Sequence, residues 1–372
     1  MRKIKRGMEK EKDINNFVNK IIVGDCIEEL KKFPDNSVDL IFADPPYNLQ
    51  LRGDLWRPNQ TKVDAVNDNW DKYESFEHYD GFTLAWLEEC RRVLKENGTI
   101  WVIGSYHNIF RVGKIMQDLG FWILNDILWI KTNPMPNFKG TRFNNAHETL
   151  IWASKNKDSK FTFHYKGMKS YNDDKQMRSD WYIPICLGNE RLKGKDGDKV
   201  HSTQKPEALL YRIILSTSNQ KDIILDPFMG SGTTGAVAKK LGRNFIGIEK
   251  EKKYINQAII RIGETKTLAE EFLKYPIEKI EQKIPFGSLI ESGFIEVGEK
   301  VFSQDRKHSA EVLSDGTLNY DEIGSIHKIS AKILGKPTNN GWEFWHVERG
   351  GKLKSINELR KEFRERFVGE NH

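Results

Sequence analysis

Short runs of β-branched and aromatic residues alternate with amphipathic helical patterns through the first 265 residues, and this alternation constrains the fold most strongly. Helices are predicted at 76–94, just before Asn97-Gly98, and at 109–119, just before Gly120. The predicted buried strands lie at 38–43, 99–103, 127–130, 149–153, 223–225 and 244–248. Strands that alternate with helices predict a doubly wound α/β domain.

The pattern changes after about residue 265, and the change predicts a second, smaller α+β domain. A charged helical stretch at 268–275 and a segment punctuated by Pro276 and Pro285 come first. Short strand-like segments and an amphipathic helix at 356–367 follow. The predicted division is a basic N-terminal extension at 1–20, an α/β domain at 21–265 that includes a basic segment at 131–205, a linker at 266–285 and a C-terminal domain at 286–372.

Composition excludes several classes of protein. With 372 residues, 38% apolar and 30% charged, the chain is long and apolar enough for a globular core. No stretch approaches the roughly 18 apolar residues of a membrane-spanning helix, which argues against membrane and secreted proteins. Cys26, Cys90 and Cys186 are widely spaced and form no CxxC motif. This spacing predicts neither a disulfide framework nor a zinc site, and it indicates a cytoplasmic protein.

Positive charge is concentrated in one part of the chain. Residues 131–205 carry 15 Lys and Arg against 8 Asp and Glu, whereas residues 266–372 carry 17 against 18. A basic block of this kind is typical of a surface that faces a polyanion such as nucleic acid, although a lysine-rich solvated loop has the same composition.

A glycine-rich turn, Asp-Pro-Phe-Met-Gly-Ser-Gly-Thr-Thr at 226–234, follows the predicted strand 223–225 and opens a helix at 235–241. Glu249 closes the next predicted strand. Such a turn lets a ligand approach the backbone, and an acid at the next strand end can bind ribose hydroxyls, so an adenosine-containing cofactor is predicted. A P-loop is disfavoured because Thr233, not Lys, follows Gly232. A purely structural glycine turn stays open.

A second turn, Asp44-Pro45-Pro46-Tyr47-Asn48, follows the predicted strand 38–43. The two prolines make it rigid and offer carbonyl acceptors instead of N–H donors. The Asp44 carboxylate and the Pro45 carbonyl can accept the two hydrogens of an exocyclic amine while Tyr47 stacks on its ring. A stiff surface turn is the alternative.

Both turns, with His201 to Glu207 between them, resemble the motifs of the β-class S-adenosylmethionine-dependent DNA amino-methyltransferases. Segments 24–26, 133–138, 145–150, 340–342 and 344–346 make the chain similar to the bacterial cell-cycle-regulated adenine-N6 methyltransferases, which act on GANTC. The resemblance implies a Rossmann-like catalytic domain, and a C-terminal domain of the kind associated with restriction-modification methyltransferases.

The resemblance also implies roles for individual residues. Asp44, Pro45, Pro46 and Tyr47 are the implied catalytic residues, acting by direct transfer without a metal. Asp25 and the Cys26 backbone would hold the adenine of S-adenosylmethionine and Glu249 its ribose, although Asp25 could equally cap a helix at 27–32. The other implied cofactor residues are Asp226, Pro227, Phe228, Gly230, Gly232, Thr233 and Lys205.

Cysteine chemistry limits the type of base that can be methylated. Carbon-5 methylation of cytosine needs a thiolate, usually in a Pro-Cys pair, and none of the three cysteines follows a proline. Adenine N6 and cytosine N4 remain, and Asp44 at the first motif position favours adenine in this family. A DNA-binding regulator without catalysis is a further alternative, which the intact motifs disfavour.

Double-stranded DNA is the predicted partner, and the family suggests a homodimer acting in replication-linked control. Leu49 and Leu51 are candidate wedges for the gap left by a flipped base, although simple packing would explain them equally. The other candidate DNA contacts are Arg52, Lys139, Arg142, Lys166, Lys169, Arg178, Ser325, Asn340, Trp342 and Arg360. Phe344 and Trp345 are predicted to be core residues.

Overall fold

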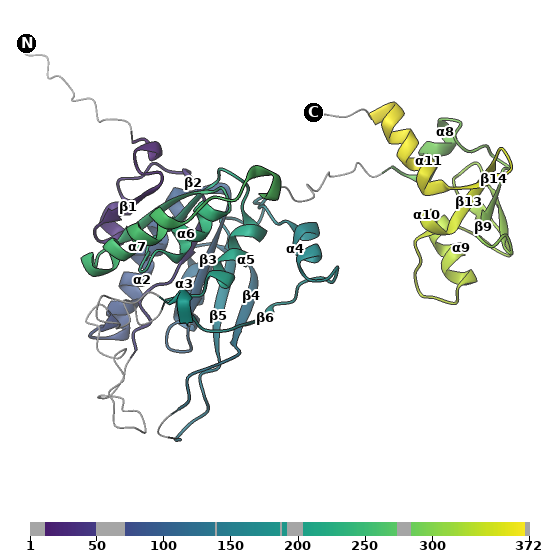
Figure 1. Cartoon of the computed structure of the whole chain (residues 1–372). Coiled ribbons are helices and arrows are strands. Elements are labelled where there is room, and N and C mark those ends of the chain that lie inside the picture. The colour runs from purple at the N-terminus through teal and green to yellow at the C-terminus, as the bar shows by residue number, and fades with distance from the viewer. Residues whose placement is uncertain are drawn as a thin grey trace, which may run out of the picture. The chain divides into compact units, whose positions relative to one another are not determined.

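The computed structural model describes residues 12–49, 71–137, 140–186, 188–191, 204–273 and 284–368. The chain divides into two compact units, residues 1–278 and 279–372 (Figure 1). No helix among the described residues is long and apolar enough to cross a membrane.

The first unit is built on an eight-stranded sheet with the strand order β1-β8-β7-β2-β3-β5-β4-β6. All neighbouring pairs are parallel except those of β5, which runs against β3 and β4. The strands are β1 (Lys20–Val23), β2 (Val38–Ala43), β3 (Leu94–Gly104), β4 (Trp122–Lys131), β5 (His147–Ser154), β6 (Asp180–Ile183), β7 (Ile223–Asp226) and β8 (Asn244–Glu249).

Helices cover both faces of this sheet (Figure 1). Side chains alternate along β2, so Ile41 packs in one cluster with Trp86 and Leu40 packs in the other with Leu210. Burying each such side chain contributes roughly 1.5–3 kcal/mol. The helices are α1 (Cys26–Leu30), α2 (Phe76–Val93), α3 (Ile109–Asp118), α4 (Tyr165–Tyr171), α5 (Glu207–Thr217), α6 (Thr233–Lys240) and α7 (Lys252–Glu264), with 3₁₀ turns at Ile14–Asn16, Gly188–Glu190 and Glu270–Leu273. The predicted doubly wound α/β domain is confirmed.

The direction of β5 determines which residues reach the functional edge of the sheet. Because β5 is antiparallel, its first residues lie where the parallel strands end. Glu148 on β5 pairs in register with Trp129 on β4, two residues before Lys131. Lys131 and Glu148 therefore lie at the edge where β2, β7 and β8 end.

The second unit is a six-stranded antiparallel sheet, in the order β12-β11-β10-β9-β13-β14, with helices packed on it. Trp345, Val301 and Leu359 are fully or almost fully buried in its core, and Phe344 packs against that core. The strands are β9 (Lys300–Ser303), β10 (Ser309–Val312), β11 (Leu318–Asn319), β12 (Ile323–Gly324), β13 (Trp345–Arg349) and β14 (Lys352–Ser355). The helices are α8 (Phe286–Glu291), α9 (Ile326–Ile333), α10 (Gly341–Phe344) and α11 (Ile356–Phe363), which continues as a π-helix at Arg364–Val368.

Two helices predicted from the sequence differ in the structure. The stretch predicted as a helix at 268–275 forms a 3₁₀ turn at Glu270–Leu273 that belongs to the first unit, because the Leu268 amide donates to the Lys240 carbonyl and Leu273 is buried. The final α-helix ends at Phe363, four residues earlier than predicted, where the π-helix begins.

Candidate active site

A pocket lies at the carboxyl edge of the first sheet, where β1, β2, β7 and β8 end. This edge is the usual ligand site of an open α/β sheet, because loops diverge there and helix N-termini point at the ligand. The predicted site residues that line the pocket are Asp25, Cys26, Asp44, Pro45, Pro46, Tyr47, Leu49, Lys205, Asp226, Pro227, Phe228, Gly230, Thr233 and Glu249. Thus the two sequence motifs, far apart in the chain, meet in one cavity.

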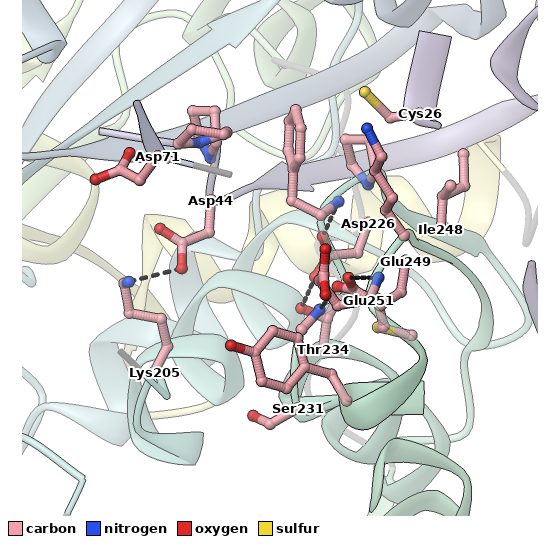
Figure 2. A pocket seen from close by; sticks show the side chains of 18 of the residues that line it. Cys26, Asp44, Asp71, Lys205, Asp226, Ser231, Thr234, Ile248, Glu249 and Glu251 are labelled. Atoms are coloured by element: carbon pink, nitrogen blue, oxygen red, sulfur yellow. Dashed lines mark hydrogen bonds and ion pairs between the residues drawn. The ribbon is translucent and has the colours of Figure 1, made fainter. Parts of the chain in front are cut away.

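Asp44 is the first residue after β2, and one of its carboxylate oxygens is left without a partner. Its Oδ2 lies 2.6 Å from the Lys205 Nζ, and Figure 2 shows the two side chains facing each other. Its Oδ1 is buried and accepts no hydrogen bond from the residues that the structure describes. Burial raises the Asp44 pKa and the Lys205 charge opposes that rise. An acceptor in this position is suited to a donor on a bound ligand.

Tyr47 is held by a carboxylate that the sequence analysis did not assign to the site. Its hydroxyl donates to Glu148 Oε2 at 2.9 Å, and the Lys131 Nζ lies 2.7 Å from Glu148 Oε1. The Lys205 Nζ lies 5.3 Å from the centroid of the Tyr47 ring. Burial opposes ionisation of Glu148, but the charges of Lys205 and Lys131 lower its pKa below the ordinary value. The ring is therefore fixed at one end by a charged acceptor.

Two further residues, Asp71 and Tyr79, form hydrogen bonds to the backbone of the turn after β2. The buried Asp71 carboxylate accepts hydrogen bonds from the amides of Asn48, at 2.7 Å, and Leu49, at 3.1 Å. The Tyr79 hydroxyl donates to the Pro46 carbonyl at 2.9 Å. Asn48 has a φ of 54°, in the left-handed region of backbone conformation that residues other than glycine rarely adopt. No sequence motif pointed to Asp71 or Tyr79.

The glycine-rich turn is organised by two acids. Asp226 Oδ1 accepts from the Phe228 amide at 2.9 Å and Oδ2 from the Thr234 hydroxyl at 2.5 Å. Glu249 Oε2 accepts from the Gly230 amide at 2.7 Å, while Oε1 accepts from the Glu251 amide at 2.7 Å (Figure 2). Each carboxylate oxygen can accept a second hydrogen bond, so Glu249 can shape the turn and still bind hydroxyl groups.

Gly232 does not line the pocket, although it was predicted to bind the cofactor. It is the N-cap residue of α6 and has a φ of 78°. A Cβ there would come within 2.8 Å of the Ala258 Cβ on α7. The glycine is needed because its backbone is left-handed and because α7 approaches it closely.

Helix α6 is linked to Lys205 through buried polar contacts. The Thr233 hydroxyl donates to the Lys205 carbonyl at 3.3 Å and accepts from the Arg261 guanidinium at 2.8 Å. Arg261 also pairs with Glu207 at 2.8 Å. The Lys205 backbone carbonyl is therefore hydrogen-bonded to the start of α6, while its side-chain ammonium pairs with Asp44.

Asp25 lies at the N-terminus of α1. Asp25 caps α1, accepting from the Ile27 amide at 3.0 Å, and it also lines the pocket, so the two roles considered for it are compatible.

Burial raises the pKa of the Cys26 thiol to about 12 and that of Cys186 to about 11. Burial raises the Cys90 pKa as well. Thiols with raised pKa values are poor nucleophiles, which agrees with the argument against carbon-5 methylation.

The predicted DNA contacts of the first unit have different surroundings. Leu51, Arg52 and Lys139 lie outside the described residues. Lys166 and Lys169 are exposed on α4, and the exposed Arg178 pairs with Asp180 at 3.0 Å. Arg142 donates to the Tyr106 hydroxyl at 2.6 Å, beside Phe143, which is 98% exposed. The basic segment thus presents cations and an aromatic ring to solvent.

In the second unit, the predicted DNA contacts have structural roles. Ser325 and Asn340 are the N-caps of α9 and α10 and accept from the amides of Lys328 and Trp342. Trp342 is 8% exposed, and the Arg360 guanidinium lies over its ring at 4.4 Å from the centroid. Since the Trp342 ring is covered, it cannot stack on DNA in this conformation, whereas Ser325 and Asn340 are exposed.

Comparison with known proteins agrees with this site. The family model described as DNA methylase (N6_N4_Mtase) matches residues 38–260, and the model described as Restriction Enzyme Adenine Methylase Associated (RAMA) matches residues 270–368. Type II methyltransferase M.HinfI of Haemophilus influenzae is 51% identical over 354 residues, which cover 95% of this chain and 99% of that protein.

Two solved structures are also similar. The M1.HpyAVI–SAM complex is 31% identical, covers 65% of this chain and 98% of that chain, and has a TM-score of 0.49. The PvuII DNA methyltransferase, described as cytosine-N4-specific, is 22% identical, covers 68% of this chain and 89% of that chain, and has a TM-score of 0.52.

The fold and the motif-lined pocket define a methyltransferase that acts on DNA. The chain belongs to the DNA methylase family of N6 and N4 amino-methyltransferases, with a restriction-modification-associated C-terminal domain. Its cofactor is S-adenosylmethionine, as predicted.

The buried Asp226 provides a prediction about stability. Burial raises its pKa to about 7, so between about pH 4 and pH 7 the folded chain holds a proton that the unfolded chain has released. Asp226 therefore destabilises the fold progressively as the pH rises through this range. Asp226→Asn removes that titration, and we expect its stability relative to wild type to increase from pH 4 to pH 7 in urea unfolding.

The exposed Asp158 offers a matched control for this experiment. The difference between Asp158→Asn and wild type is expected to stay constant over the same range. A constant difference for Asp226→Asn as well would show that burial does not raise the Asp226 pKa.

Proposed function

We propose that this enzyme transfers the methyl group of S-adenosylmethionine directly to N6 of an adenine that is flipped out of double-stranded DNA. The observation that carries the proposal is the buried Asp44 Oδ1, which accepts no hydrogen bond from the described part of the chain and belongs to a residue that lines the pocket with the glycine-rich turn. A carboxylate oxygen without a donor costs free energy until a ligand supplies one. The exocyclic amine of a flipped base would supply it.

The residues of the pocket support direct transfer. The amine nitrogen attacks the methyl carbon, a nitrogen–carbon bond forms as the sulfur–carbon bond breaks, and S-adenosylhomocysteine leaves. Asp44 Oδ1 and the Pro45 carbonyl accept the two amine hydrogens, which orients the lone pair, and after transfer one proton passes from the methylated nitrogen to Asp44 and then to solvent. The Tyr47 ring, held by Glu148, provides a stacking surface for the base.

Adenine is favoured over cytosine for two reasons. Asp44 occupies the first motif position, where the resemblance associates aspartate with adenine. The model that matches residues 270–368 describes a domain associated with adenine methylases. Cytosine-N4 transfer uses the same type of amine, so it is the alternative that the experiment must distinguish.

The test identifies the methylated base directly. The enzyme is incubated with DNA and S-adenosylmethionine that carries a tritiated methyl group, and the DNA is digested to nucleosides. We expect the label in N6-methyladenosine of the deoxy series. Label in N4-methylcytosine would overturn the choice of adenine but keep the chemistry of Asp44.

We further propose GANTC as the recognition sequence, a homodimer in which one copy serves each strand, and activity linked to replication. The similarity of segments 133–138, 145–150, 340–342 and 344–346 to the GANTC-type enzymes supports the first of these. Single-molecule sequencing of DNA from cells that express the chain reports the base and its context together. Methylation at a different sequence would refute GANTC, and a monomer in sedimentation at working concentration would refute the dimer.

The proposed ribose contact of Glu249 gives a prediction about the cofactor. Glu249→Ala should weaken binding of S-adenosylmethionine by about 1–3 kcal/mol, the scale for losing hydrogen bonds to a charged group. Titration calorimetry measures the change. Glu264→Ala, at an exposed acid near the end of α7, is the control and should bind normally. Unchanged affinity in Glu249→Ala would remove this residue from the site.

A further inference from the structure

Four largely buried charged side chains lie beside the turn after β2 and sum to zero charge. Lys205 is the central residue, with its Nζ 2.6 Å from Asp44 Oδ2 and 4.0 Å from Glu148 Oε2. Glu148 is balanced on its other side by Lys131, at 2.7 Å. The side chains of Lys205, Glu148 and Lys131 are 7%, 11% and 11% exposed. We call Asp44, Lys205, Glu148 and Lys131 the charge cluster.

The charge cluster is expensive unless every member is paired. Taking an ion out of water costs several kcal/mol, and only close opposite charges and hydrogen bonds offset that cost. Each charge here has an opposite partner, and Asp44 pairs through Oδ2 only, while its buried Oδ1 accepts no hydrogen bond from the described residues. The ion pair therefore holds one carboxylate oxygen and leaves the other without a hydrogen-bond donor among the described residues.

We propose that Lys205 is a positioning residue for methyl transfer, which keeps Asp44 charged and turned with Oδ1 toward the amine, and that Glu148, balanced by Lys131, holds Lys205 there. The inference deepens the proposed function and rests on it. Lys205 acts through Asp44 and not as a ligand of the cofactor.

Charge balance explains why a lysine can stand so close to an amine that becomes positive. As the methyl group transfers, positive charge develops on the attacked nitrogen, and a lone ammonium nearby would oppose it. Glu148 compensates Lys205, so the amine still meets the negative field of Asp44. Without Lys205, burial would favour the protonated form of Asp44. A neutral carboxylic acid is a weaker acceptor for the amine hydrogens than a carboxylate.

The anchoring of the Lys205 backbone supports the same role. Its carbonyl accepts a hydrogen bond from the hydroxyl of Thr233, the first residue of α6, and Thr233 accepts one from Arg261. The start of α6 therefore fixes the backbone position from which the Lys205 ammonium extends. The cofactor loop and the catalytic acid are thereby held in one geometry.

The charges that face Asp44 predict shifts of opposite sign. The titratable groups around it are Lys205, Glu148, Tyr47, Asp71 and Asp226. Removing the Lys205 charge raises the Asp44 pKa further, because the largest effect that opposes burial is then lost. Removing the Glu148 charge lowers the Asp44 pKa, because a like charge is lost. If Lys205 and Glu148 only stabilised the fold, removing their charges would not shift the Asp44 pKa in opposite directions.

The test measures single-turnover methylation of DNA by the full-length protein between pH 5 and pH 9, at saturating cofactor and DNA. Lys205→Met should slow transfer at neutral pH by about tenfold or more and move the acid limb upward by about one pH unit, since one unit corresponds to a tenfold change in protonation. Lys205→Arg should keep the wild-type limb because the charge remains. Glu148→Gln should move the limb downward.

Calorimetry of S-adenosylmethionine binding separates this inference from its alternatives. Affinity within about twofold of wild type is expected for Lys205→Met, because its effect is electrostatic and local to Asp44. Lys114→Met, at an exposed lysine on α3 paired with Asp118, is the matched control and should not move the limb. If Lys205→Met does not fold, as judged by circular dichroism, the downward shift in Glu148→Gln decides.

An unmoved acid limb together with a large loss of cofactor affinity in Lys205→Met would overturn the inference and make Lys205 a cofactor ligand. An unmoved limb in Glu148→Gln would also overturn it. Failure of the proposed function has a different signature, namely that Asp44→Asn itself retains full methyl transfer.

Discussion

Asp44→Asn is expected to reduce methyl transfer by about 10²–10⁴-fold, the range for removing a positioned acid or base, while S-adenosylmethionine still binds. The asparagine has the same shape, but it lacks the charge that stabilises the developing positive nitrogen, and its Nδ2 is a donor that repels the amine hydrogens. Asp44→Ala should lower the rate below detection. Single-turnover transfer of tritiated methyl groups measures the rate, and calorimetry measures cofactor affinity.

The ion pair with Lys205 determines the control for this experiment. Asp44→Ala alone leaves a buried ammonium without its partner at 2.6 Å, which costs about 3–5 kcal/mol of stability when a buried pair is broken. The double variant Asp44→Ala, Lys205→Met removes both charges and should recover much of that stability without recovering activity. Wild-type transfer rates in folded Asp44→Asn would refute the proposed mechanism.

The location of the pocket could be predicted from the sequence because neighbouring strands end together. Asp44 and Glu249 each follow or close a run of buried residues, and Asp226 closes another. In a parallel sheet the carboxyl ends of such runs share one edge, so the two motifs had to meet near it. The confirmed fold and cofactor follow from this pattern, whereas the roles of individual side chains stay predictions.

Glu148 could not be placed in this way, because nothing in the local pattern of β5 shows its direction. A buried run such as 147–154 has the same composition whether the strand is parallel or antiparallel. The antiparallel pairing with β3 and β4 brings its first residues, and not its last, to the pocket. Asp71 is a similar case, since its partners are backbone amides that no side-chain motif reveals.

Trp342 shows the opposite difficulty. A tryptophan beside Asn340 and Gly341 fits either a DNA contact or a core position by residue type. In the structure it packs edge-on against Phe286 at 5.9 Å between ring centroids, and Arg360 covers it. Trp342→Ala would therefore test the core of the second unit, and Asn340 and Ser325 are the exposed positions that remain candidates for DNA contact.

Removal of the second unit is expected to abolish DNA methylation without abolishing cofactor binding. A chain that ends at Glu278 keeps the pocket, the charge cluster and the buried Leu273 of the first unit. It should bind S-adenosylmethionine with nearly wild-type affinity, measured by calorimetry after circular dichroism has shown that it is folded.

The physical reason for the loss is the cost of opening the DNA duplex. Flipping a base costs a few kcal/mol in unstacking and unpairing, which contacts on both sides of the target must offset. The basic segment of the first unit supplies charge, but the second unit is nearly neutral, so its contribution has to come from specific polar contacts rather than from net charge. Asn340→Ala and Ser325→Ala in the full-length protein should accordingly reduce discrimination between DNA sequences more than cofactor affinity. If the truncated, folded enzyme methylates the same sequence at an undiminished rate, the second unit does not read DNA.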